Sequence, residues 1–303
     1  MKKKSDKSKV PRIADRFSEV VLDKPILEFG YPVASDDDDD DSDFSSLLSR
    51  SQKTPFSLIA ASLYNVDYSN RIIVIKDRID EKCFVYAQMI ENWNRYDKIG
   101  MEVKEKYLSI LQNNADAKLI FAPEDDEEAE NKSEKLIQDY PEIMDVIDFI
   151  SPYNLSETSL VNFNADPIRI KFNSPGGWLV AYQTLADVIN LSKTKIIGIN
   201  MGMAYSAAAF LLVACHERLA LPKSRMMVHR GSGGVFGTYE QTENSHRNYS
   251  AEVNEMIDSF IKRTKLTKKE LNKRMNPDMY LSAKEALKYG LIDRIVDNID
   301  DII

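Results

Sequence analysis

One serine in the middle of the chain stands where a predicted strand gives way to a predicted helix. The strand covers residues 195–199, which are apolar and β-branched, and the helix covers residues 207–215, which are mostly Ala, Leu, Val and Phe. Ser206 lies between them among small residues, so its hydroxyl would project at a strand end. The helix N-terminus would offer free N–H groups and a positive dipole to an oxyanion. Serine is also a common helix cap, and this segment alone favours the cap.

A nucleophilic serine needs a base, and the chain has three histidines. His229 follows a predicted strand at residues 225–228 and precedes a glycine-rich stretch, so we expect it at a strand end. His216 is expected at the surface, after the buried helix, and His246 lies within a polar helix. His229 is therefore the best-placed base. An orienting carboxylate would complete the set, and Asp278 is one of several loop carboxylates that could supply it.

A second turn could bind the oxyanion. Residues 173–177 (Asn-Ser-Pro-Gly-Gly) lie between a predicted strand at 168–172 and a predicted helix at 178–191. Two glycines let the backbone approach a ligand closely, with N–H groups that face it. Such a turn would supply one half of an oxyanion hole, and the N–H of Ala207 would supply the other half. The same residues also fit an ordinary strand-to-helix turn.

Composition narrows the class of protein. With 303 residues and 43% hydrophobic content, the chain can form one large domain or two small ones. A net charge of −8 argues against a general nucleic-acid binder. The two cysteines lack metal-type spacing, which favours free thiols in a reducing compartment. No segment has the length and apolarity of a membrane span or a signal peptide. We therefore expect a cytoplasmic protein without a metal or a cofactor.

The composition and the hydrophobic pattern change along the chain. A body with alternating strands and helices predicts an α/β domain with mostly parallel strands. An arm rich in aspartate precedes this body and is expected to be disordered. An insertion with small helices and an acidic stretch interrupts it. The expected boundaries are 1–56 for the arm, 57–98 and 164–303 for the body, and 99–163 for the insertion.

Five segments, in the same order, resemble the proteolytic subunit of the Clp protease. They are residues 172–177 (Phe-Asn-Ser-Pro-Gly-Gly), 202–212, 221–229, 278–283 and 285–293. The resemblance covers about residues 63–95 and 166–297. It implies a crotonase-like spiral of β-β-α units with a protruding helical handle, which corresponds to residues 239–275.

The resemblance also implies an activity, that of a serine endopeptidase with a Ser-His-Asp triad. It assigns Ser206 as the nucleophile, His229 as the general base, Asp278 as the orienting acid, and the N–H groups of Gly176, Gly177 and Ala207 as the oxyanion hole. It implies a protein or peptide substrate and a homo-oligomeric ring, with two rings stacked through the handles. The chain lacks a Gly-x-x-x-x-Gly-Lys-Ser/Thr phosphate loop, so any ATP dependence would come from a separate AAA+ unfoldase.

Some residues depart from the family pattern. Tyr205 stands where the family has a small residue, Ala207 where it usually has methionine, and Pro277 where it has an arginine that helps to link two rings. Tyr205 and Pro277 leave open a catalytically weak Clp-like scaffold subunit. The insertion and the acidic arm leave open a viral prohead maturation protease of the same fold, with the arm as a removable segment or a scaffold tether. A crotonase-like acyl-CoA enzyme would need no triad, so the three residues argue against it.

Overall fold

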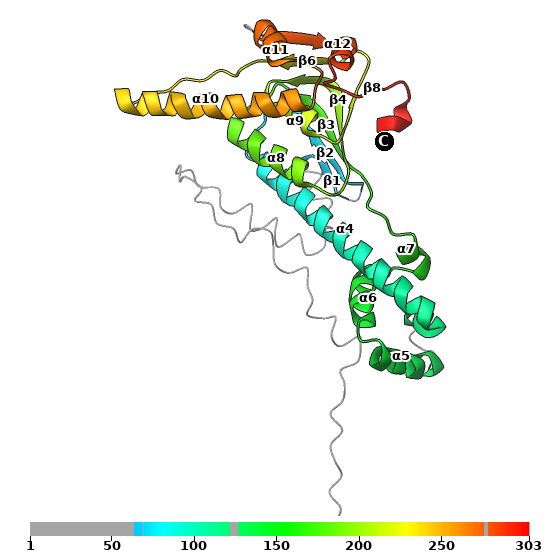
Figure 1. Cartoon of the computed structure of the whole chain (residues 1–303). Coiled ribbons are helices and arrows are strands. Elements are labelled where there is room, and N and C mark those ends of the chain that lie inside the picture. Colours follow the sequence, from blue (N-terminus) through cyan, green and yellow to red (C-terminus); the bar gives the residue numbers. More distant parts are fainter. Residues whose placement is uncertain (1–63, 69, 122–126, 276–277, 303) are drawn as a thin grey trace, which may run out of the picture. The chain divides into compact units, whose positions relative to one another are not determined.

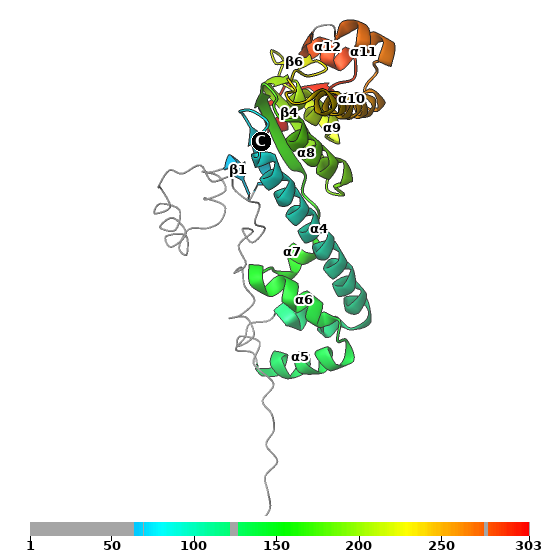
Figure 2. The same cartoon turned by 90° about the vertical axis from the view of Figure 1, so that its left-hand side faces the viewer.

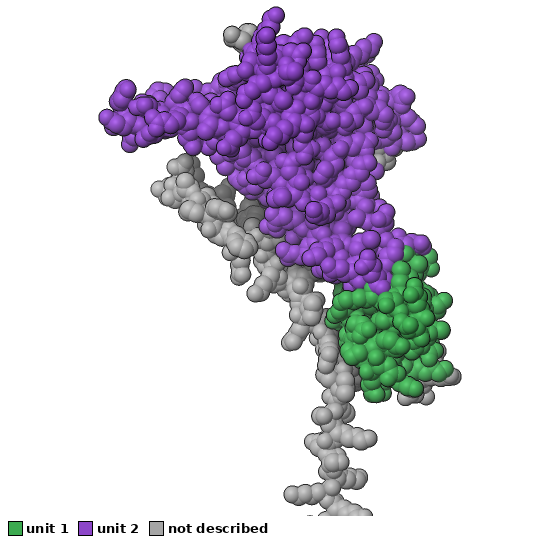
Figure 3. Space-filling view, in the orientation of Figure 1, with its two compact units in different colours: residues 1–49, 106–161 green, residues 50–105, 162–303 purple. Residues whose placement is uncertain are grey.

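The computed structural model describes residues 64–68, 70–121, 127–275 and 278–302. The predicted arm (1–56) lies outside these residues, as do Pro277 and the first part of the acidic stretch of the insertion. The chain divides into two compact units, which Figure 3 colours separately. We call them the sheet unit, with described residues 64–105 and 162–302, and the inserted unit, with described residues within 106–161. The domain boundaries expected from the sequence stay a prediction.

The sheet unit is built on one eight-stranded sheet with the order β1-β2-β3-β4-β5-β8, from which β6 and β7 branch beside β4. The strands are β1 (Val66–Asp67), β2 (Ile72–Ile75), β3 (Ile168–Ser174), β4 (Ile196–Tyr205), β5 (Glu217–Ala220), β6 (Arg225–Val228), β7 (Met279–Ser282) and β8 (Arg294–Ile295). The β1–β2 and β6–β7 pairs are antiparallel, and the other strand pairs are parallel. The predicted α/β class with mostly parallel strands is confirmed.

Strand β4 is twice as long as the predicted strand, because it changes partner along its length. Residues 197–200 pair with β5, and residues 203–205 pair with β6. The buried side chain of Asn200 lies where the partner changes: its Nδ2 donates to the carbonyl of Arg225 at 2.9 Å, and its Oδ1 accepts from the N–H of Gly202 at 3.2 Å. Through this change of partner, β4 ends beside β6.

The sheet unit also contains helices. They are α4 (Lys82–Asn113, which continues into the inserted unit), α8 (Leu179–Leu191), α9 (Ala207–Ala214), α10 (Tyr239–Lys262), α11 (Lys268–Arg274), α12 (Ala283–Lys288) and the short 3-10 helix η3 (Ile299–Ile302). Every residue of α9 is buried, and this helix contacts α8, α10 and β4. Figure 2 shows α8, α9 and α10 on the same side of β4. Because α9 is buried on all sides, apolar residues occupy every position of the helix.

Helix α10 is buried only over its second half, at Val253, Met256, Ile257 and Phe260. Its first half is exposed, and Figure 1 shows it projecting beyond the other helices of the sheet unit. A capping box between Thr238 and Gln241 fixes its start. The predicted polar helix over 239–263 is thus confirmed, and its exposed half has the form expected of a handle.

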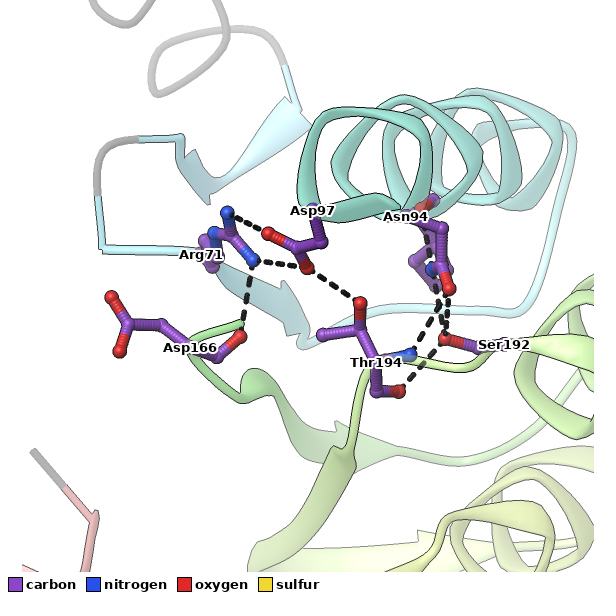
Figure 4. A network of polar contacts seen from close by, with 7 residues as sticks. Arg71, Asn94, Asp97, Asp166, Ser192 and Thr194 are labelled. Carbon is purple, nitrogen blue, oxygen red and sulfur yellow. Dashed lines mark hydrogen bonds and ion pairs between the residues drawn. The ribbon is translucent and has the colours of Figure 1, made fainter. Parts of the chain in front are cut away.

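A polar network fastens α4 to the sheet (Figure 4). The Arg71 guanidinium forms two bonds with the Asp97 carboxylate, at 2.6 and 2.7 Å, and the Thr194 hydroxyl donates to the same carboxylate. One turn earlier, Asn94 accepts from the backbone N–H groups of Lys193 and Thr194. Helix α4 continues past this anchor without a break, to Asn113.

The inserted unit has its own helices: η1 (Ala115–Phe121), α5 (Glu127–Asp139), α6 (Ile143–Ile150), η2 (Ser151–Tyr153) and α7 (Glu157–Val161), besides the end of α4. The break between α5 and α6 falls at Pro141. Tyr107 is fully buried, donates to Glu157 Oε1 at 2.7 Å and stacks edge-to-face on Phe121. The inserted unit therefore has a packed interior of its own.

Candidate active site

Ser206 occupies the junction of β4 and α9 in an unusual backbone conformation, with φ 53° and ψ −129°. A positive φ is rare for a residue with a side chain and is costly unless the surrounding structure imposes it. Here the N–H of Ser206 donates to the carbonyl of Met227 at 2.8 Å, which ties the turn to β6. Its side chain makes no capping bond to α9. The helix-cap interpretation of Ser206 is therefore wrong, and its hydroxyl is free for another partner.

That partner is His229, which lies directly after β6. Its Nε2 is 2.7 Å from Ser206 Oγ, a hydrogen-bond distance. The pairing of β4 with β6 brings the two residues together, because Tyr205 is aligned with Met227. The imidazole is 19% exposed, so it is partly shielded from water while one edge stays accessible. The spatial pairing of Ser206 with His229 expected from the sequence is thus present.

Asp278 faces the other nitrogen of the same imidazole. Its Oδ1 is 3.5 Å from His229 Nδ1, which is longer than a good N–H···O bond. For Nε2 to accept the serine proton, neutral His229 must carry its own proton on Nδ1, the nitrogen that faces the carboxylate. The three side chains therefore have the order of a Ser-His-Asp triad, with a close first contact and a loose second one.

The glycine turn lies against this serine. Gly176 has φ 94°, and a Cβ built on it would be 2.6 Å from Ser206 Cβ and 3.0 Å from the nitrogen of Ala207. Gly177 forms a parallel bridge with Ile79, in which Ile79 bonds to the residues on either side of Gly177. The N–H of Gly177 therefore points away from Ile79. Ala207 is the first residue of α9, whose N–H has no acceptor within the helix.

Ser174, which sequence reasoning missed, supports this turn. It is fully buried, its hydroxyl donates to the carbonyl of Asp77, and its Oγ accepts from the N–H of Gly176 at 3.1 Å. This bond uses the Gly176 N–H, so of the two glycine amides only that of Gly177 is available to a ligand. The expectation that Gly176 also donates to an oxyanion is wrong in this conformation. A serine two residues before a Gly-Gly pair was the signal in the sequence.

The other titratable candidates lie elsewhere. His216 accepts from the N–H of Ile196 through Nδ1, and His246 is exposed on α10. Cys83 and Cys215 are buried, and burial raises the pKa of each thiol to about 12. Among the described residues, no three or more His, Cys, Asp or Glu side chains are grouped to hold a metal ion, and no helix is long and apolar enough to cross a membrane.

Comparison with known proteins identifies the family. The family model described as Clp protease matches residues 159–299, a range that contains all six residues expected at the site. The chain is 36% identical over 132 residues to an ATP-dependent Clp protease proteolytic subunit of Deinococcus radiodurans, a match over 43% of this chain and 65% of that protein. It is 35% identical over 136 residues to proteolytic subunit 2 of Prochlorococcus marinus (strain NATL2A), over 44% of this chain and 68% of that protein. It is 33% identical over 138 residues to proteolytic subunit 3 of Synechococcus sp. (strain CC9902), over 45% of this chain and 69% of that protein. The chain thus spans about two thirds of the length of the relatives it matches, and on these matches it belongs to the Clp protease family.

Proposed function

We propose that this protein is a serine endopeptidase that uses Ser206, His229 and Asp278. The observation that carries the proposal is the 2.7 Å contact between Ser206 Oγ and His229 Nε2, made by a serine in a strained turn that leaves its hydroxyl uncapped. A serine that only caps a helix adopts an extended backbone conformation and does not bear the free-energy cost of a positive φ. Membership of the Clp protease family supports the same conclusion.

In this proposal His229 acts first as a base and then as an acid. Its Nε2 takes the proton of Ser206 while the hydroxyl oxygen attacks the peptide carbonyl carbon. The resulting imidazolium returns the proton to the leaving amine, and the acyl group stays on Ser206. A water molecule, activated by the same Nε2, then attacks the acyl-enzyme and releases the serine. Asp278 stabilises the imidazolium and holds its orientation without taking the proton.

Two backbone N–H groups would bind the oxyanion of the tetrahedral intermediate, those of Gly177 and Ala207. Both are unused by their own secondary structure, and the α9 N-terminus adds its positive dipole. Removal of one such donor typically costs about 3 kcal/mol of transition-state stabilisation. This set replaces the three-amide oxyanion hole that the sequence led us to expect.

The substrate and the partners follow from the family. We infer that the substrate is an unfolded or delivered protein, that the active form is a homo-oligomeric ring, and that ATP dependence resides in a separate AAA+ unfoldase. The relatives are named as proteolytic subunits of an ATP-dependent protease, which supports the last point. The exposed half of α10 is available for contact between rings.

A catalytically weak scaffold subunit is the second candidate. The observation in its favour is the 3.5 Å separation of His229 Nδ1 from Asp278 Oδ1, across which a strong hydrogen bond does not form. The third candidate, a prohead maturation protease, depends on cleavage near residues 35–60. Those residues lie outside the described part of the chain, so that candidate stays a prediction.

Labelling with a fluorophosphonate tests the proposal. The full chain is treated, its native mass is recorded, and the modified residue is identified by mass spectrometry. We expect covalent modification of Ser206, lost in Ser206→Ala and in His229→Ala. His246→Ala is the matched control, because it removes an exposed histidine on α10 and should leave labelling unchanged. Absence of labelling in an assembled ring would overturn the peptidase proposal and favour the scaffold.

A further inference from the structure

An aromatic pair crosses the three strands that carry the candidate triad. The rings of Tyr205 and Tyr280 meet edge-to-face, with centroids 5.9 Å apart and planes at 86°. Tyr205 is the last residue of β4, and Tyr280 lies in β7. These strands are not neighbours, because β6 pairs with both of them.

The register explains how the two rings meet. Tyr205 is aligned with Met227 of β6, and Met227 is aligned with Tyr280 of β7, so the three form one row across the strands. Two strands separated by a third lie about 9.6 Å apart. A centroid distance of 5.9 Å therefore means that the rings lean toward each other over Met227. Smaller side chains at these positions would not bridge the strands.

The same row lies on the face of the sheet that carries the candidate base and acid. Side chains alternate between faces along a strand, so His229 follows the orientation of Met227, and Asp278 that of Tyr280. The neighbouring row, formed by Ala204, Met226 and Leu281, is fully buried and faces the core. The tyrosine pair therefore lies on the same face of the sheet as His229 and Asp278, two residues along the strands from them.

We propose that Tyr205 and Tyr280 are positioning residues that hold β7, and with it Asp278, against the strands that lead to Ser206 and His229. The proposal rests on the proposed function. Among the described strands β7 pairs only with β6, and Asp278 lies just outside its first hydrogen-bonded residue. The ring contact gives β7 a second attachment, to the strand that ends at the nucleophile. Its effect on catalysis passes through the orientation that Asp278 gives to His229.

The position of Tyr280 makes the test practical. Its side chain is 62% exposed, so truncation leaves no cavity in the core. Tyr280→Ala removes the ring contact, and Tyr280→Phe keeps it, since an edge-to-face contact needs the ring and not the hydroxyl. Tyr153→Ala is the matched control: it removes a tyrosine with 60% exposure that belongs to the inserted unit.

The experiment measures the rate at which a fluorophosphonate labels Ser206, in protein of wild-type native mass. We expect Tyr280→Ala to slow labelling by about tenfold, the scale that one aromatic pair supports. Tyr280→Phe and Tyr153→Ala should retain the wild-type rate. In an Asp278→Asn background, Tyr280→Ala should cause no further loss, because the pair acts only through that carboxylate.

The outcomes separate this proposal from the proposed function. No labelling of the wild-type protein would defeat the peptidase proposal itself. Labelling of the wild type with an unchanged rate in Tyr280→Ala would leave the triad standing and overturn the positioning role. An equal loss with and without Asp278 would also overturn it, since the tyrosines would then act by another route. Loss of the wild-type native mass in Tyr280→Ala would assign the pair to subunit assembly instead.

Discussion

Replacement of Gly176 by alanine tests the packing of the candidate site at its tightest point. A Cβ on Gly176 would lie 2.6 Å from Ser206 Cβ and 2.7 Å from the carbonyl oxygen of Tyr205. To reach an ordinary contact of 3.4 Å, the two carbon atoms must separate by about 0.8 Å. The backbone of the turn would have to move as well, because φ 94° is unfavourable for a residue with a side chain.

Two effects follow, and they have different sizes. The strained backbone should cost about 1–3 kcal/mol of folding free energy. A displacement approaching 1 Å at the nucleophile should reduce the rate of its reaction by about a hundredfold. Gly176→Ala is therefore expected to fold with a lower melting temperature and to lose most of its reactivity toward a fluorophosphonate.

The assay compares the labelling rate of Ser206 with the thermal unfolding midpoint in the same samples. Gly233→Ala serves as the control, because a Cβ on Gly233 would meet nothing within 4 Å. It should match the wild type in both measurements. A wild-type labelling rate in folded Gly176→Ala would refute the reasoning, since Ser206 would then tolerate a displaced neighbour.

Three further predictions concern groups outside the candidate site. Asp97→Ala should lower the free energy of unfolding, measured by chemical denaturation, by about 3 kcal/mol, because it leaves the Arg71 guanidinium without its buried partner. Glu102→Ala is the control: it removes only an exposed ion pair and should change the free energy of unfolding by less than about 0.5 kcal/mol. Burial lowers the pKa of His216 from its usual value near 6.5, and the charges of Arg263 and Lys195 add to the shift. The unfolded chain therefore binds more protons than the folded chain below that pH, so the free energy of unfolding should fall as the pH drops through about 6.5. His216→Gln should weaken this pH dependence in unfolding titrations. Both cysteine thiols, with pKa values raised to about 12, should resist iodoacetamide at pH 8 in the native protein and react after unfolding.

Much of the site could be predicted because its signals are local. The apolar sequence after Ser206 predicts the buried helix α9, and the Gly-Gly turn predicts close backbone approach near residue 176. Ser282 and Glu285 predict the capping box that starts α12, and all its bonds are present. The spacing of residues could not single out Asp278, because only the antiparallel pairing of β7 with β6 brings it to His229.

Local patterning did not predict the elements whose structure depends on their neighbours in the fold. Glycine lowers helix propensity, yet α4 runs through Gly100. A Cβ at residue 100 would lie 2.3 Å from the ring of Phe163, so glycine is there for close packing and not to end the helix. The short strands β5 and β7 carry charged or mixed residues and are defined by their partner strands, which local patterning does not reveal.

The two contacts within the candidate triad depend on different parts of the fold. Ser206 and His229 follow β4 and β6, which pair directly, and the Ser206 N–H bond to Met227 locks the two strand ends together. Asp278 precedes β7, which among the described strands is paired by hydrogen bonds only with β6, and the Asp278 side chain is 36% exposed against 19% for His229. The first contact is therefore close in a single chain, whereas the second is long. Any interaction that moves Asp278, just before β7, toward His229 would shorten the second contact without disturbing the first, so control of this site should act on the acid and not on the nucleophile.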